Sequence, residues 1–206
     1  GGSRRGPSRP AKGAMTYALL KFAHILGAVL IGGGLIGVWL TDLRSRQVRE
    51  LPQFAEAVRY IAVFYDGVVV PGALLLLISG AWLIVTHFGG WAFLGIPWLA
   101  GMVALFAFEF IEGNTVTRLY FMRLRRMTRA ALAIGRFTPE LERERAKLMP
   151  SFTHFLDLPM LFVIIALGAI RPTTWGLFLT GSLAAMAVAT ALTIHIPRLY
   201  PWSGDR

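Results

Sequence analysis

The sequence contains no cysteine, and charged side chains make up only 16% of its 206 residues. Without cysteine the chain has no disulfide framework, no thiolate metal site and no thiol for a lipid anchor. Acidic residues are also scarce, because 11 Asp and Glu stand against 21 Lys and Arg, which leaves a formal net charge of +10. The cations flank apolar segments and form no nucleic-acid-reading motif, so we expect no nucleic-acid partner.

Apolar residues are abundant, since 55% of the chain is hydrophobic and the mean hydropathy is +0.59. The clearest apolar run, residues 68–85, carries no charge and is interrupted only by Pro71 and Gly72. A helix of about 20 such residues crosses the hydrocarbon core of a bilayer. The sequence therefore predicts an all-α, polytopic membrane protein whose main partner is the lipid bilayer.

Five transmembrane spans are predicted, and together they form a single helical domain over residues 15–206. They cover residues 17–40, 61–86, 98–120, 155–170 and 175–194. Residues 1–14 are small and basic and lack apolar periodicity, so we interpret them as a flexible basic arm, either native or left over from expression.

The connections between the spans differ in positive charge. Residues 41–59 and 123–147 are rich in arginine, whereas residues 87–98 and 171–176 contain tryptophan and almost no cations. Cations collect on the cytoplasmic side of a membrane. We therefore predict a multi-pass protein of the bacterial inner membrane with its N-terminus outside and its C-terminus inside, although the basic residues between positions 4 and 12 oppose this orientation.

Carboxylates within the spans are the first candidate functional residues, because a charge at the centre of a membrane helix costs about 2.5–3.5 kcal/mol. Glu109 and Glu112 lie three residues apart on one helical face, far from either end of their span. Asp66 and Asp157 lie in the inner half of two other spans. Clustered carboxylates exchange protons or bind cations, so one hypothesis is a proton path or cation site in which Glu109, Glu112 and Asp157 handle protons.

A structural explanation of the same carboxylates stays open. Asp66 then anchors the wet end of its helix, and Glu112 pairs with Arg118 or Asn114. Asp157 then occupies the first turn of the fourth span, where the helix macrodipole favours an anion.

The four histidines differ in position. His24 lies within an apolar stretch, where its ring nitrogens need a hydrogen-bond partner or a metal. A neutral imidazole is a common axial ligand of haem iron, and the alternative is a bond to a carboxylate such as Glu109. His87, His154 and His195 lie near the ends of their spans and are interpreted as interfacial anchors, or, for the last two, as ligands of a second inner cofactor.

Small residues line the first span. Gly33 and Gly37 form a GxxxG step, which is typical of close helix packing, and bare backbone at such a step also makes room for a flat cofactor. The same small-residue face supports a second hypothesis, in which the chain is a non-catalytic accessory or assembly subunit that packs against other subunits of a larger membrane complex.

Two segments resemble a known family. The first span, YALLKFAHILGAVLIGGGLIG, has Lys21 three residues before His24 and is similar to the first helix of HemJ-type protoporphyrinogen oxidases and their CopD-like relatives. The segment HFLDLPMLFVIIALGAIRP, with Asp157 two residues before Pro159 and an Arg-Pro pair at its end, resembles the last core helix of that family. The resemblance covers residues 17–172 and is nearest to a related, uncharacterised bacterial integral-membrane family.

The resemblance implies a helical bundle in which His24 binds b-type haem. For the oxidases it also implies the removal of hydride equivalents and protons from a porphyrinogen. Lys21 belongs to the implied cofactor-binding set, and His87 and Met102 are the candidates for a second axial ligand. The chain departs from the family in three respects: the third span lacks the family's histidine pattern, Thr153 and Leu156 replace an expected Arg and Asn, and a fifth span is added.

Overall fold

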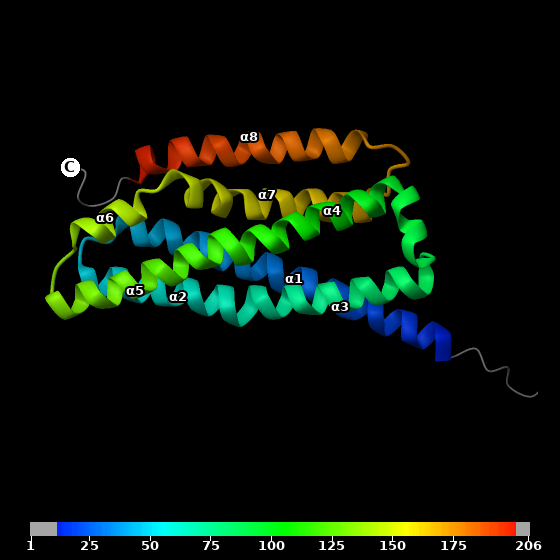
Figure 1. Ribbon diagram of the computed structural model, residues 1–206, viewed down its shortest axis with the longest axis horizontal. Coiled ribbons are helices and arrows are strands. Elements are labelled where there is room, and N and C mark those ends of the chain that lie inside the picture. Colours follow the sequence, from blue (N-terminus) through cyan, green and yellow to red (C-terminus); the bar gives the residue numbers. More distant parts are fainter. Residues whose placement is uncertain (1–11, 201–206) are drawn as a thin grey trace, which may run out of the picture.

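The computed structural model describes residues 12–200, and within this range the chain consists of helices and short connections without any strand (Figure 1). The elements are α1 (Lys12–Gln47), α2 (Leu51–Phe64), the π-helical turn η1 (Tyr65–Val69), α3 (Val70–His87), the 3-10 turn η2 (Gly90–Gly95), α4 (Pro97–Glu112), the π-helical turn η3 (Gly113–Thr117), α5 (Arg118–Ile134), α6 (Pro139–Arg145), α7 (Leu148–Ile170) and α8 (Gly176–Leu199). The predicted all-α fold with five membrane-spanning helices is confirmed. The predicted arm lies mostly outside the described residues, and its last three residues already belong to α1.

Three of the five membrane-crossing helices are longer than the sequence predicts. Gly13–Gln47, Leu51–His87 and Pro97–Ile134 contain 35, 37 and 38 residues, or about 55 Å of helix at about 1.5 Å per residue. A hydrocarbon core is only about 30 Å thick. These helices therefore continue past the membrane, and the predicted arginine-rich loops are largely helical extensions of the spans.

The extensions pack together at one end of the bundle, which we call the arginine-rich end. Its hydrophobic core joins the end of α1 with α2, α5 and α6, and its most buried side chains include Phe54, Ile61, Leu124 and Leu141. Helix α5 supports this core because its buried residues recur on one face while its arginines cover the other. Gly135, in the left-handed region at φ 79°, ends α5. Thr138 accepts a hydrogen bond from the Leu141 amide and begins α6.

Helices α1 and α3 pack in close contact through small residues. A Cβ atom at Gly27 would lie 2.9 Å from the carbonyl oxygen of Gly72, and one at Gly34 would meet Val69. The predicted Gly33–Gly37 step has a different role: Gly33 faces open space, while Gly37 packs against Phe64 of α2. Of the two glycines in this step, only Gly37 makes a contact inside the bundle, and Gly33 lies on a free face.

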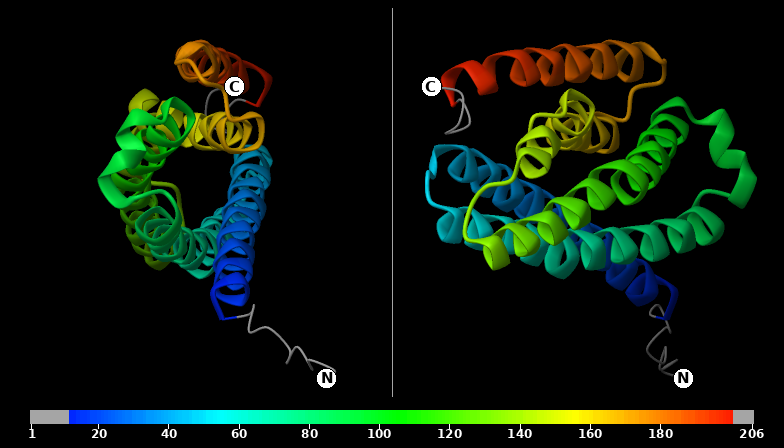
Figure 2. Two further views of the ribbon diagram at one scale, coloured as in Figure 1. Left: turned by 90° about the vertical axis from the view of Figure 1, so that its right-hand side faces the viewer. Right: turned by 60° about the vertical axis from the view of Figure 1, so that its left-hand side comes forward.

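Helix α7 lies at the centre of the bundle and α8 at its outside. Most of α7 is buried, and it contacts α1, α4 and α8. Helix α8 packs mainly on α7 and buries a stripe of Ala185, Ala189 and Thr193, so most of its surface faces outward (Figure 2). α1 begins and α8 ends at opposite ends of the bundle, and the side of the membrane on which each end lies stays a prediction.

Candidate functional site

Two π-helical turns face each other where α2–α3 approaches α4–α5. The Tyr65 hydroxyl in η1 donates a hydrogen bond of 2.8 Å to the carbonyl oxygen of Gly113 in η3. A Cβ atom at Gly113 would lie 2.7 Å from that hydroxyl oxygen, so glycine permits the contact. Pro71 follows η1 and has no N–H to donate to a carbonyl one turn back, which favours an irregular turn there. Such π-helical turns are frequent at functional sites.

Beside these turns, three carboxyl groups from two helices come together. Glu109 and Glu112 belong to α4, and Asp157 belongs to α7. The Asp157 carboxyl interacts electrostatically with both glutamate carboxyls. Carboxylates that lie close together in a low-dielectric interior repel one another, which favours a proton on at least one of them. The structure thus brings together the three residues that the sequence predicts for proton handling.

The structural explanation of Asp157 given by the sequence was wrong. α7 begins at Leu148, so Asp157 lies about two and a half turns inside the helix and is 4% exposed. The macrodipole acts within the first turn and does not account for an acid at this depth. The carboxylate is held among other acids in the interior of the bundle.

Threonine hydroxyls extend this cluster toward the arginine-rich end. Thr117, which is fully buried, donates a hydrogen bond of 2.8 Å to Oε1 of Glu112. Its hydroxyl oxygen also lies 3.1 Å from that of Thr153 on α7. Glu112 therefore bonds to Thr117. The sequence had suggested Arg118 or Asn114 as its partner, and neither of them bonds to it.

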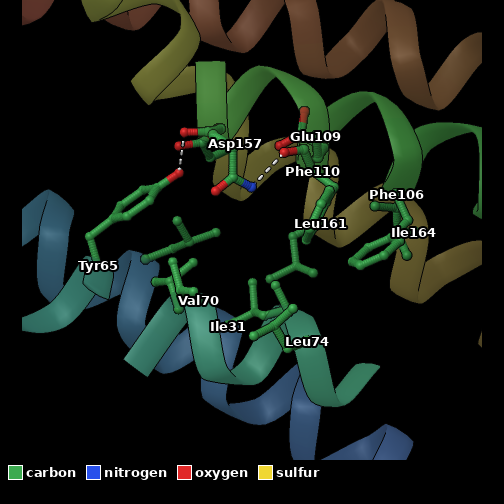
Figure 3. Close-up of a pocket in the computed structure, with 15 residues that line it drawn as sticks. Ile31, Tyr65, Val70, Leu74, Phe106, Glu109, Phe110, Asp157, Leu161 and Ile164 are labelled. Carbon is green, nitrogen blue, oxygen red and sulfur yellow. Dashed lines mark hydrogen bonds between the residues drawn. The ribbon is translucent and has the colours of Figure 1, made fainter. Parts of the chain in front are cut away.

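A partly open cavity of about 120 Å³ lies in front of the carboxyl groups, between α1, α3, α4 and α7 (Figure 3). Its polar lining consists of Tyr65, Glu109, Asn114 and Asp157, and its apolar lining includes Ile31, Val70, Leu74, Phe106 and Leu161. The Asn114 side chain donates a hydrogen bond of 2.8 Å to the Phe110 carbonyl oxygen. Among the described residues, no hydrogen-bond partner reaches Oε1 of Glu109 or Oδ2 of Asp157. Two acids of the lining thus carry a carboxyl oxygen without a partner among these residues, and the Asn114 amide keeps a second N–H.

Asp66 and Arg118 form an ion pair of 2.9 Å between η1 and the start of α5. The two side chains are 42% and 39% exposed, so the pair lies at the edge of the site. Asp66 does not mark a helix end, because α2, η1 and α3 form one continuous helix. The predicted role of Asp66 as an end anchor was wrong.

A model of a family described as predicted integral membrane proteins, DUF2269, matches residues 18–172. The chain belongs to this family. The match to DUF2269 runs from α1 through α7 and ends before α8. No curated protein and no solved structure matches the chain. Membership of DUF2269 confirms an integral membrane protein. Three finer points stay predictions: the resemblance to HemJ-type and CopD-like proteins, the association with other subunits, and the location in the bacterial inner membrane.

In this DUF2269 chain His24 faces α3 and not Glu109. Its Nδ1 atom lies 3.2 Å from the Ser79 hydroxyl oxygen, and that hydroxyl donates a hydrogen bond of 2.6 Å to the Leu75 carbonyl. The Ser79 oxygen is then left to accept from Nδ1–H, so Nε2 carries the lone pair. Gly80 allows the approach, because a Cβ atom there would lie 3.0 Å from Cε1 of His24.

The other predicted haem residues lie apart from His24. His87 packs on Tyr17 with 4.7 Å between ring centroids, and Tyr17 lies about two turns of α1 away from His24. Met102 packs into the core between α4, α7 and α8, and Lys21 is exposed. Within residues 12–200, no three His, Asp or Glu side chains are arranged to hold a metal ion. The structure thus does not group Lys21, His87 and Met102 around His24, and a haem site built on these residues stays a prediction.

His154 is not an interfacial anchor, as the sequence suggested, because its ring is only 2% exposed at the arginine-rich end. Its Nε2 atom lies 3.9 Å from Oδ2 of Asp42, and Asp42 forms a buried ion pair of 2.9 Å with Arg46. The indole of Trp39 donates to the His154 carbonyl oxygen at 3.1 Å. The sequence signal for this cluster, an Asp–Arg pair spaced i, i+4 on one helix, went unrecognised. His195 is exposed on α8, so it does not share the buried environment of His154.

Proposed function

We propose that this protein transfers protons within the membrane and that Glu109, Glu112 and Asp157 are the exchanging groups. The observation that carries the proposal is the grouping of these three acids from α4 and α7, with Asp157 buried and in electrostatic contact with both glutamates. Glu109 lies about 18 Å along the helix from Pro97, deep within a core about 30 Å thick. At that depth a group of three acids is retained at a high energetic cost, which favours a functional role.

The neighbouring hydroxyls give the proton a direction. Glu109 and Asp157 line the cavity, and Glu112 lies on the side of Thr117 and Thr153, nearer the arginine-rich end. A hydroxyl group both donates and accepts, so it passes a proton along without holding a charge. A proton taken up at the cavity therefore has a route through the three carboxyls as far as Thr153.

Infrared difference spectroscopy of the purified protein tests this proposal, because the C=O stretch of a protonated carboxylic acid is separate from that of a carboxylate. We expect such a band near neutral pH, its loss in Asp157→Asn, and its retention in the matched control Asp66→Asn. In liposomes, Asp157→Asn and Glu109→Gln should both slow proton flux. Fully ionised carboxylates, or unchanged flux in both variants, would overturn the proposal.

Binding of b-type haem at His24 is the second candidate function. The supporting observation is the Ser79 contact, which orients the imidazole and leaves the lone pair on Nε2, as in metal-ligating histidines held by an outer hydrogen bond. When bound, haem supplies one-electron chemistry. The absorption spectrum of the detergent-purified protein, expressed with added haem, tests this: a Soret band that His24→Ala abolishes and His87→Ala preserves supports it, and its absence excludes it.

A further inference from the structure

We propose that the cavity in front of Glu109 and Asp157 binds a lipid-soluble primary ammonium ion, which is taken up in exchange for a carboxyl proton. The inference rests on the proposed proton transfer for the exchange, while binding of the ammonium ion has a test of its own. The exchange is balanced in charge and atoms: a protonated carboxyl and an R–NH3⁺ ion become a carboxylate–ammonium pair, and one proton is released.

The hydrogen-bonding groups that line the cavity favour a ligand that donates hydrogen bonds. The Tyr65 hydroxyl proton and one of the two Asn114 N–H groups are already engaged, because they donate to backbone carbonyls of η3 and α4, which leaves the lining one further N–H donor. Oε1 of Glu109 and Oδ2 of Asp157 are buried oxygens without a hydrogen-bond partner among the described residues. Buried polar atoms are normally satisfied. A ligand that brings N–H donors satisfies both oxygens, whereas a carboxylate or phosphate ligand adds only acceptors.

Charge selects a cation among the donors. The charged or titratable groups that face the carboxyls are Tyr65 from η1, the three acids themselves from α4 and α7, and none from the α1 lining. Arg118, the cation beside η3, is held by Asp66 at the edge of the site. Among residues 12–200, no lysine or arginine lines the cavity. A hydrogen bond between a carboxylate and an ammonium ion is roughly twice as strong as a neutral one.

The volume of the cavity and its apolar lining indicate the size and character of the remaining part of the ligand. The volume of about 120 Å³ is close to the roughly 150 Å³ of an engineered apolar cavity that holds benzene. Phe106 and Leu161 offer an aromatic and an aliphatic wall beside the acids, about one turn away on the same helices, and Leu74 and Ile31 lie across the cavity (Figure 3). A ring-sized or short-chain amine places its ammonium group at Glu109 and Asp157 and its apolar part on these walls.

Calorimetric titration of the full chain in nanodiscs tests the proposal with benzylammonium as the probe. Benzyl alcohol is the neutral ligand of the same shape, and benzoate is the anionic one. We expect benzylammonium to bind, and heats measured in buffers of different ionisation enthalpy to show one proton released for each ion bound. We expect neither control ligand to bind comparably. Equal binding of benzyl alcohol, binding without proton release, or no binding of benzylammonium would each overturn the proposal.

Variants locate the binding site. Asp157→Asn should weaken benzylammonium binding by about tenfold or more, since it removes one partner of a buried charge pair. The control Glu56→Gln, which neutralises an exposed acid of α2 away from the cavity, should leave the affinity unchanged within error. If Asp157→Asn does not fold, Ala73→Phe fills the cavity without touching an acid and should abolish binding. Unchanged affinity in the folded variant would overturn the proposal.

Different experimental results would overturn the proposed function and this inference. The infrared band of protonated carboxyls is recorded on the same sample without ligand. A band that is present while benzylammonium does not bind overturns the ammonium site and leaves proton transfer standing. A missing band overturns proton transfer itself, and with it the exchange.

Discussion

The hydroxyl of Tyr65 donates a hydrogen bond to the carbonyl oxygen of Gly113 and joins two π-helical turns on neighbouring helices. Tyr65 is 6% exposed, so this bond lies in the interior. η3 directly follows Glu112, and the bond therefore fixes the end of α4 that carries the two glutamates. The site thus depends on a side-chain contact between segments 48 residues apart in the chain.

Tyr65→Phe tests this contact. The variant keeps the ring but leaves the Gly113 carbonyl without its donor, so we expect the free energy of unfolding to fall by about 1–3 kcal/mol. Thermal unfolding in detergent measures the loss. The matched control is Tyr60→Phe, which removes the same hydroxyl from an exposed ring of α2 and should change stability little. Equal effects of the two substitutions would show that the Tyr65 bond does not stabilise the fold.

A disulfide between α4–α5 and α7 tests the arrangement around the acids. The hydroxyl oxygens of Thr117 and Thr153 lie 3.1 Å apart, and the natural chain has no cysteine that would compete. We expect the double variant Thr117→Cys/Thr153→Cys to oxidise to an intramolecular disulfide, detected by a gel shift that reductant reverses. Thr128→Cys/Thr153→Cys, which uses another buried threonine farther along α5, is the control and should stay reduced. The reverse result would contradict the packing of these helices.

Two glycine substitutions in α1 should have opposite effects. A methyl group at Gly27 would meet the backbone of α3 at 2.9 Å, so Gly27→Ala forces the helices apart, and we expect a loss of about 1–3 kcal/mol. At Gly33 the same methyl group meets nothing within 4 Å. Because alanine is the better helix former by about 1 kcal/mol, Gly33→Ala should be neutral or stabilising. Thermal unfolding measures the stability of both variants. A loss of stability in Gly33→Ala would indicate a contact at that face.

Removal of one partner from the buried Asp42–Arg46 pair should destabilise the arginine-rich end strongly. Arg46→Met leaves the Asp42 carboxylate buried without its ion pair beside His154, and such changes cost about 3–5 kcal/mol. The double variant Asp42→Leu/Arg46→Met removes both charges and should recover much of the stability.

The control for this pair is Arg59→Met, which breaks the exposed ion pair with Glu56 and should have little effect. Thermal unfolding compares the variants. If Arg46→Met were no more harmful than Arg59→Met, the ion pair of Asp42 and Arg46 would not contribute to the fold.

The sequence predicted the class of protein and the five membrane-spanning helices, because hydropathy reports directly on the cost of placing a residue in lipid. It also singled out Glu109, Glu112 and Asp157, since acids in apolar runs are conspicuous. It misjudged where the helices end, because amphipathic extensions such as α5 have a low mean hydropathy although one face is buried. The burial of His154 was missed for a different reason: its neighbours on α1 are more than 100 residues away in the chain.

What the sequence determined by itself is local: which segments are apolar enough to cross a membrane, and which of them carry a charge. Only the tertiary structure decided which acids meet. Asp157 reaches Glu109 and Glu112 while Asp66 pairs with Arg118, because the packing of α7 on α4, and not spacing along the chain, sets those distances. It likewise directed His24 to Ser79, since the close contact of α1 with α3 places a hydroxyl nearer to the ring than any carboxylate.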